Sequence, residues 1–493
     1  MRCTRVLLVS LLLCFALVVP AQASSLPGWP AQPSARFQAV PCSTFARWVA
    51  ANRCGYLIVP EDWSSQHGPT VQVAVAVFKS MLPHPAPDPL VYLNGGPGGP
   101  TITLLGPTLG ESGLPGVFGN RDIILVDQRG SGLSKPSLAC PEISAAVLNN
   151  GDFMQAVQAC HERLVHEGVD PSDYTTLDAA ADVAALGPAL GYKSVNLYGI
   201  SYGTRLALTA MRLFPSRVRG VVLDSVYPPQ LSEPTALIES EGHVLTAIMA
   251  ACAADRYCRT TYPHLAATFS SLVEKLNTWP VWIQASLPST KRVVDVMLSG
   301  DTLWRLIFTT LYSPSNGSVP QMIETASRGG YGLLTKAYGM YLDDLVYSYF
   351  GLNISVYCSE DVPFTSPDEI TAAAQTLPAL LRPGAIAGGL SEQQECQIWH
   401  VNPLPAWQKA AVRSSIPTLV LSGQFDPVTP PSYGTLAART LPHSYVFTFP
   451  AQGHGQLFGK TLCPASITTA FLKNPAKRPD ASCIANMPPL VFD

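Results

Sequence analysis

Valine occupies every second position from Val71 to Val77, within residues 70–80. This alternation predicts a half-buried strand, and residues 56–59 are expected to form its neighbour. Farther along, the chain carries short, largely continuous apolar runs, which are typical of parallel strands buried on both faces. These runs are residues 90–93, 123–126, 195–198, 221–223 and 418–421.

Helical stretches lie between these predicted strands. Residues 177–190 are rich in alanine and end at Gly191, a residue type that commonly terminates helices. Residues 202–214 carry leucine and alanine on one face and stop before Pro215, which cannot continue a helix. The alternation of strands and helices predicts an α/β fold with a mostly parallel sheet.

The pattern changes between residues 228 and 405, where helical segments dominate and no clear parallel-strand run appears. Strand signals return at Ile416. This arrangement predicts a mainly helical lid, inserted between two parts of one sheet domain. We therefore expect a core formed by residues 24–227 and 406–493, with the lid at residues 228–405.

The first residues have the pattern of an export signal. Arg2 and Arg5 precede an apolar stretch at residues 6–19, and Ala21-Gln22-Ala23 is a small-x-small cleavage pattern. The stretch is shorter than the ~20 apolar residues that a membrane span needs. We predict a cleaved signal peptide at residues 1–23 and a secreted or periplasmic protein. The alternative is an N-terminal anchor that is never cleaved, and no later segment is predicted to span a membrane.

Cysteine usage agrees with an oxidising compartment. Twelve cysteines are present, two of them within residues 1–23, so ten remain after cleavage. An even number outside the cytosol favours disulfides over free buried thiols. Because the cysteines fall into close successive couples, we expect sequential pairing, although sequence alone does not determine connectivity. They are Cys42, Cys54, Cys140, Cys160, Cys252, Cys258, Cys358, Cys396, Cys463 and Cys483. No C-x-x-C or H-E-x-x-H pattern suggests a metal site.

Composition narrows the possible partners. Hydrophobic residues make up 47% of the chain and charged residues only 13%, which excludes a highly charged disordered protein. The 31 lysines and arginines against 34 acidic residues give a net charge of −3. Without a basic excess, no nucleic-acid partner is expected. No obligatory protein partner can be recognised either.

The candidate nucleophile is Ser201. It lies in Gly199-Ile200-Ser201-Tyr202-Gly203, a G-x-S-x-G pattern that follows a predicted strand and opens a predicted helix. This strand–turn–helix context is the one in which the pattern carries chemistry. The sharp turn presents the serine hydroxyl at the carboxyl end of the sheet, where ligands of α/β proteins bind.

An oxyanion hole is expected beside this serine. The backbone N–H of Tyr202 is one candidate donor, because it lies at the start of the helix. The second candidate is Gly96, within the glycine-rich stretch of residues 94–99 that directly follows a strand. Glycine lets the backbone approach a reacting carbonyl closely.

The candidate acid and base follow the last two predicted strands. Asp426 comes after residues 418–421, and His454 comes after a further strand, in the chain order Ser, Asp, His. His454 would act as general base and then as general acid, while Asp426 would stabilise the imidazolium. Asp224, which also ends a strand, is a rival for the role of the acid.

These stretches together resemble a known family. They read LVYLNGGPGGP, IILVDQRGSGLS, VNLYGISYGTRLA, LVLSGQFDPVTPP and AQGHG. The set is similar to the prolyl aminopeptidase and tripeptidyl aminopeptidase family of secreted α/β-hydrolase serine peptidases, with its characteristic C-terminal segment. The resemblance covers about residues 54–226 and 416–483, and the lid is only loosely similar.

The resemblance implies an α/β-hydrolase that removes residues from peptide N-termini through an acyl-enzyme, without a cofactor. It implies the same nucleophile, acid, base and oxyanion donors as the residue patterns. The turn at Asp127 and Arg129 is expected to be structural. Prolyl aminopeptidases usually have histidine where this chain has Asn94, so the chain leans towards the tripeptidyl branch.

The substrate would be a peptide with a free N-terminus, whose ammonium needs a carboxylate in an enclosed pocket. The candidates are Glu360 and Asp361, just after Cys358, and the resemblance favours Glu360. The alternative is a solvated acidic pair beside a disulfide. The sequence also fits two other functions. One is a carboxylesterase or lipase on the same scaffold; the other is a non-catalytic binding protein, against which the intact set of catalytic residue types argues.

Overall fold

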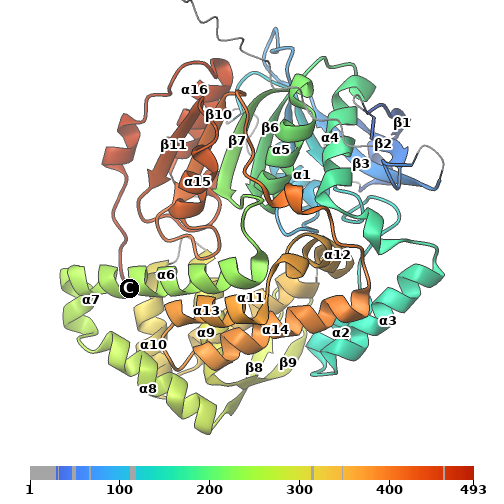
Figure 1. Ribbon diagram of the computed structural model, residues 1–493. Coiled ribbons are helices and arrows are strands. Elements are labelled where there is room, and N and C mark those ends of the chain that lie inside the picture. Colours follow the sequence, from blue (N-terminus) through green and yellow to red (C-terminus); the bar gives the residue numbers. More distant parts are fainter. Residues whose placement is uncertain are drawn as a thin grey trace, which may run out of the picture.

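The computed structural model describes residues 29–30, 33–46, 51–65, 68–111, 118–312, 316–346, 348–458 and 461–493. The predicted signal peptide, residues 1–23, lies outside the described residues. Figure 1 shows a sheet domain with helices on both faces and, below it, a second body built mainly of helices. We call the second body the lid. The predicted α/β fold with a mainly helical lid is confirmed.

The sheet domain is organised around nine strands in the order β1-β2-β3-β5-β4-β6-β7-β10-β11. The pairs among β1, β2, β3 and β5 are antiparallel, and all pairs from β5 to β11 are parallel. The strands are β1 Arg36–Val40, β2 Arg53–Pro60, β3 Thr70–Phe78, β4 Leu90–Leu93, β5 Ile123–Val126, β6 Val195–Ser201, β7 Val218–Val226, β10 Thr418–Gly423 and β11 Ser444–Phe449. Each apolar run of the sequence analysis lies within one of these strands.

Helices cover both faces of the sheet. The helices of this domain are α1 Thr101–Glu111, α4 Thr176–Leu190, α5 Tyr202–Leu213, α15 Pro431–Ala438 and α16 Cys463–Lys473. Alternate residues of β4 enter different cores: Val91 packs with α4 and α5, while Tyr92 packs with α1 and α16. A parallel strand that is apolar on both sides therefore separates two hydrophobic cores.

The lid has a hydrophobic core of its own. Its helices are α6 Glu233–Ala254, α7 Arg256–Thr261, α8 Leu265–Thr278, α9 Gly300–Tyr312, α10 Val319–Ser327, α11 Gly332–Val346, α12 Phe350–Glu360, α13 Pro367–Ala373 and α14 Arg382–Trp399. Two earlier helices, α2 Pro141–Leu148 and α3 Phe153–His166, pack against α11 and α14 respectively and lie beside the lid in Figure 1.

An antiparallel pair of strands in the lid was not predicted. β8 Val281–Ser286 and β9 Val293–Leu298 form a separate two-stranded sheet. Ile283 and Ala285 are buried while Gln284 is exposed, which is the period-two pattern of a half-buried strand. Trp282 is apolar yet 66% exposed, so the alternation is blurred in the sequence.

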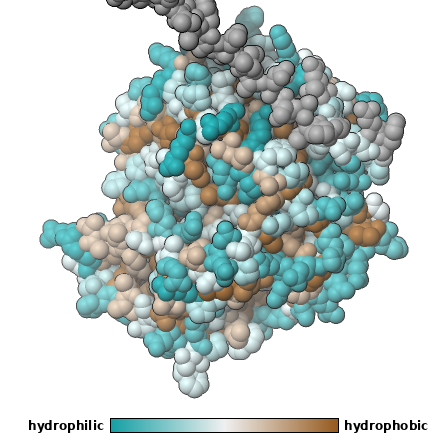
Figure 2. Space-filling view, in the orientation of Figure 1, coloured by the Kyte–Doolittle hydropathy of each residue, from teal (hydrophilic) through white to brown (hydrophobic). Residues whose placement is uncertain are grey.

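By length and composition alone, α6 is the one described helix that could cross a membrane. Of its most apolar window, 44% is buried inside the protein. Figure 1 shows α6 lying between the sheet domain and the rest of the lid, as a core helix does. On the face seen in Figure 2, hydrophobic residues form separate groups among hydrophilic ones rather than a continuous band.

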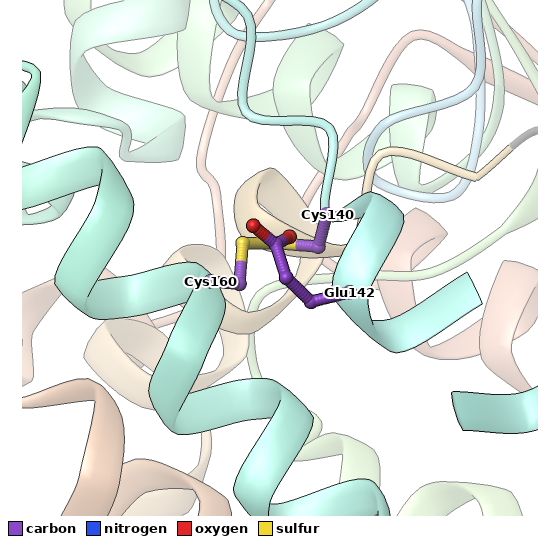
Figure 3. Close-up of side chains that lie close together, drawn as sticks. All are labelled: Cys140, Glu142 and Cys160. Carbon is purple, nitrogen blue, oxygen red and sulfur yellow. A yellow bond between two sulfur atoms is a disulfide. The ribbon is translucent and has the colours of Figure 1, made fainter. Parts of the chain in front are cut away.

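Five disulfides confirm the sequential pairing of the ten cysteines. They are Cys42–Cys54, Cys140–Cys160, Cys252–Cys258, Cys358–Cys396 and Cys463–Cys483. Such a set is typical of extracellular proteins. Figure 3 shows the carboxylate of Glu142 beside the Cys140–Cys160 bridge. Both sulfur atoms are bonded to each other, so this group is not a thiolate metal site.

Candidate active site

Ser201 lies at the sharp turn between β6 and α5. Its backbone has φ 56° and ψ −128°, in the left-handed half of conformational space that residues with a side chain rarely adopt. A strained serine between a strand and a helix is the geometry of a nucleophile elbow. The motif permits this turn because its last residue, Gly203, has no side chain. A side chain there would collide with the carbonyl oxygen of Leu93.

The glycine-rich loop after β4 lies against this serine. A Cβ atom placed on Gly95 would lie 2.8 Å from the Cβ of Ser201. The neighbouring Gly96 has φ 112°, which only glycine adopts readily. The side-chain amide of Gln128 donates a 2.9 Å hydrogen bond to the carbonyl oxygen of Asn94 and so holds the start of the loop.

His454 and Asp426 meet at the carboxyl edge of the sheet. Nδ1 of His454, which follows β11, lies 3.0 Å from both carboxylate oxygens of Asp426, which follows β10. The hydroxyl of Thr429 donates to Asp426 Oδ2 at 2.7 Å, and its backbone N–H donates to Oδ1 at 2.9 Å. This buried carboxylate is therefore oriented by several donors at once.

The electrostatics of this pair favour an ionised acid beside a basic imidazole. Burial alone would raise the pKa of Asp426. The charge and the hydrogen bond of His454 have a larger, opposite effect, so the pKa lies below its ordinary value. Burial lowers the pKa of His454, but the carboxylate of Asp426 outweighs it, and that pKa is raised.

Asp224, the rival acid, has different partners. Its carboxylate accepts hydrogen bonds from the backbone N–H of Gln456, at 3.0 and 2.9 Å, and from the hydroxyl of Tyr198. Burial raises the pKa of Asp224 to about 6. Asp224 thus holds the segment that follows His454, while the imidazole itself hydrogen-bonds to Asp426.

A pocket in front of Ser201 is shared by the sheet domain and the lid. The predicted oxyanion donors Gly96 and Tyr202 belong to its wall, and so do charged residues from both bodies. The predicted nucleophile Ser201 also lines the pocket. The charged residues that line it are Arg205, Glu233 and Asp361.

The two predicted ammonium-binding residues point to different partners. Glu360 accepts hydrogen bonds from the backbone N–H and the hydroxyl of Thr176, at 2.6 and 2.7 Å. Asp361 lines the pocket, where it pairs with Arg205 Nη1 at 2.9 Å and with Lys409 Nζ at 2.6 Å. Both carboxylates are 1% exposed, so they are not a solvated surface pair.

Sequence reasoning missed several residues of this site, among them Arg205 and Lys409. Gln128 and Thr429 lie inside the quoted motifs, three residues or fewer from a residue singled out. Glu233 lies at the start of α6, far from any motif, and lines the pocket beside Ser201. Burial, then the Asp361 charge, raise the pKa of Glu233 to about 7.

Comparisons with known proteins agree with this architecture. Residues 88–269 match the family described as alpha/beta hydrolase fold, and residues 386–483 match the family described as TAP-like protein. The chain is 25% identical to "Serine protease Hip1" of Mycobacterium tuberculosis over 85% of its own length and 84% of that protein. It is 29% identical to "Tripeptidyl aminopeptidase" of Streptomyces lividans over 36% of each chain. It is also 29% identical to "Proline iminopeptidase" of Neisseria meningitidis over 31% of its length and 37% of that protein.

The chain is thus an α/β-hydrolase with a TAP-like C-terminal segment. Its matched relatives include a protein named tripeptidyl aminopeptidase and one named proline iminopeptidase, in agreement with the resemblance carried by the motifs. Its homologues are serine peptidases and aminopeptidases.

Proposed function

We propose that this protein is a secreted serine aminopeptidase that cleaves peptide bonds near free N-termini through an acyl-enzyme on Ser201. The contact between His454 Nδ1 and Asp426, 3.0 Å long and buried at the same sheet edge as the nucleophile elbow, carries the proposal. The five disulfides support secretion, together with the predicted signal peptide.

In this mechanism His454 removes the proton from the Ser201 hydroxyl as the oxygen attacks the scissile carbonyl. The raised pKa of His454 suits this role, because the imidazolium formed is stabilised by Asp426. The imidazolium then gives its proton to the leaving amine, and a water molecule releases the acyl group by the same route. The backbone N–H groups of Gly96 and Tyr202 would bind the oxyanion.

Recognition of the free N-terminus is assigned to carboxylates of the pocket. Asp361 lines it together with Glu233, and Glu360 supports the same region through Arg205, whose Nη1 lies 3.6 Å from Glu360 Oε2. An ammonium is bound most strongly by ionised carboxylates in an enclosed site. The lid would also limit how many residues lie between the ammonium and the scissile bond.

The test is a panel of fluorogenic aminoacyl, prolyl and tripeptidyl amides, each with a free and an N-acetylated amine. We expect hydrolysis of the free-amine series only, and loss of both hydrolysis and fluorophosphonate labelling in Ser201→Ala. Ser270→Ala, at a partly exposed position on α8 of the lid, is the matched control. Equal rates on free and acetylated substrates, with fast turnover of simple esters, would favour the carboxylesterase alternative instead.

A further inference from the structure

Tyr312 of the lid lies against the candidate base of the sheet domain. It is the last residue of α9, and its ring centre is 5.3 Å from that of His454, with 65° between the two ring planes. This is an edge-to-face arrangement, which aromatic rings favour. The lid therefore touches the imidazole itself, through a residue that takes no part in the proton transfer.

A row of aromatic rings holds Tyr312 from the lid side. Trp304, Phe308 and Tyr312 are four residues apart, so they share one face of α9. The successive ring centres are 6.2 and 5.7 Å apart, and Phe269 of α8 lies 6.1 Å from Trp304. Phe269, Trp304 and Phe308 are buried in the lid core. Tyr312 is thus the outer end of a packed row.

The outer end of this row remains accessible. Tyr312 is 39% exposed, whereas Trp304 and Phe308 are buried. Desolvation by the surrounding protein, followed by the charges of Asp426 and Glu233, raises the pKa of the Tyr312 hydroxyl, so this group stays protonated. An uncharged aromatic side chain that is held in place yet accessible offers a large contact area to a bound molecule.

The imidazole determines which part of a substrate lies near Tyr312. Nδ1 of His454 is occupied by Asp426 at 3.0 Å, so the proton of the reaction is carried by the other ring nitrogen, Nε2. The leaving amine takes this proton and must lie within hydrogen-bond distance of Nε2. The His454 side chain is only 12% exposed, so a leaving residue that reaches Nε2 comes close to the ring packed on the imidazole.

The released N-terminal segment lies elsewhere. In the proposed aminopeptidase it occupies the pocket in front of Ser201, whose wall includes Glu233 and Asp361 but not Tyr312. The residue that follows the scissile bond lies outside this pocket, because it departs on the other side of the carbonyl that Ser201 attacks. Tyr312 is an accessible aromatic side chain in contact with the group that protonates this departing residue.

We infer that Tyr312 forms the subsite for the residue that directly follows the scissile bond, and that this subsite prefers an aromatic side chain. The inference rests on the proposed aminopeptidase function and adds the leaving side of its substrate class. The substrate ring would pack on the accessible part of Tyr312, as Phe308 packs on it within the lid. An acidic side chain would be disfavoured there, because the Asp426 carboxylate contacts the same imidazole.

The experiment uses the whole protein with its disulfides and free-amine peptides that begin with a unit released from the amide panel. The next residue is phenylalanine, leucine, glycine or aspartate, followed by an amidated carboxyl end, and chromatography measures the products. We expect kcat/KM for phenylalanine to exceed that for glycine by about fivefold, as one added aromatic contact gives, and aspartate to be slowest. Tyr312→Ala should bring the phenylalanine-to-glycine ratio close to one, whereas Tyr312→Phe should retain it.

A methyl ester of the same N-terminal unit separates this role from positioning of the imidazole. Its leaving group, methanol, carries no side chain to pack on Tyr312, so Tyr312→Ala should leave kcat/KM for the ester near its native value. Activity on the ester also shows that the variant is folded. An equal loss on the ester and on all peptides would overturn the subsite, since Tyr312 would then only orient His454.

Tyr257→Ala, at an exposed position on α7, is the matched control and should keep the native phenylalanine-to-glycine ratio. A native ratio of one, or a preference for phenylalanine that survives Tyr312→Ala, would also overturn the subsite. Failure of the proposed function is separately visible, since N-acetylation of the glycine peptide would then leave its rate of cleavage unchanged.

Discussion

The two sides of the pocket handle buried charge differently. At the sheet edge, the Asp426 carboxylate has an imidazole and several hydrogen-bond donors around it, and its pKa is lowered. On the lid side, Glu233 has a raised pKa, and the neighbouring Asp361 is paired with Arg205 and Lys409. The first arrangement is complete without substrate, whereas in the second the charge of one carboxylate, Asp361, disfavours ionisation of another, Glu233.

The difference reflects two tasks. Proton transfer needs a base whose orientation and charge are established before the substrate arrives, because reorganisation during the reaction would slow it. Selective binding needs the opposite, a group that is costly to leave unpaired and is paired by the correct ligand. Substitutions on the two sides should therefore have different consequences.

The largest effect is expected at the balanced side. Asp426→Asn should lower kcat by about 10⁴-fold, as loss of the acid does in serine hydrolases generally, because the imidazole loses its orientation and its compensating charge. Steady-state kinetics on a free-amine substrate measure this change. Asp224 hydrogen-bonds to the Gln456 backbone, so Asp224→Asn should mainly reduce stability and should alter the pH dependence of kcat little. If Asp224→Asn instead changed the kinetics strongly and Asp426→Asn did not, the role of the acid would return to Asp224.

A smaller effect, on stability, is expected from removing the buried cation of the pocket, Arg205. Arg205→Met leaves Glu360 and Asp361 with less compensation and should lower the free energy of unfolding by about 3–5 kcal/mol. Urea denaturation followed by circular dichroism measures this loss. Arg256→Met, at an exposed position on α7, is the control and should unfold as the native protein does. An unchanged midpoint for Arg205→Met would mean that this network does not stabilise the fold.

The disulfide between two lid helices, Cys358–Cys396, should contribute less. Cys358–Cys396 joins α12 to α14 and closes a loop with a sequence separation of 38. Replacing both cysteines by alanine should lower the free energy of unfolding by about 2–4 kcal/mol, since the unfolded chain gains freedom. The thermal midpoint of the double variant, compared with that of the native protein under oxidising conditions, measures the loss. Equal midpoints would show that α12 and α14 are held together by packing alone.

The smallest effects concern pH. The pKa of Glu233 is about 7, above its ordinary value of 4.5, so this carboxyl is mostly protonated below pH 7 in the folded protein. Ionisation strengthens ammonium binding, and KM for free-amine substrates should therefore fall as the pH rises through about 7. Because the folded state binds this proton more tightly than the unfolded state, stability without substrate should decrease over the same rise, from about pH 4.5 to 7.

Glu233→Gln separates these effects from those of His454, whose pKa is also raised. In this variant the pH dependence of KM should flatten, while the dependence of kcat on the neutral imidazole should remain. Both are read from kinetics between about pH 5 and 8, below the pKa of the substrate amine at ~8. A KM profile identical to that of the native protein would remove Glu233 from ammonium recognition.

Much of the site could be predicted because its chemistry is concentrated in short motifs. The elbow at Ser201 depends on glycines within two residues of it, and Asp426 and His454 each follow a recognisable strand. The sequence also identified the pair Glu360 and Asp361. These residues are adjacent at the end of α12, yet Glu360 hydrogen-bonds to Thr176 and Asp361 pairs with Arg205. The direction of a side chain at a helix end depends on tertiary packing, and the hydrophobic periodicity of the sequence does not predict it.

The amino-acid sequence by itself determined the alternation of strands and helices and the sharp turn at Ser201, because these follow from hydrophobic patterning and from glycines close along the chain. It favoured sequential disulfides without determining their connectivity. Only the tertiary structure decided which carboxylate meets His454 and which ones share the pocket. The two carboxylates that line it, Glu233 and Asp361, lie more than 120 positions apart in the sequence and face Ser201 only because the lid packs on the sheet domain. Charge compensation in a buried region is a property of that assembled space, so no local pattern could reveal it.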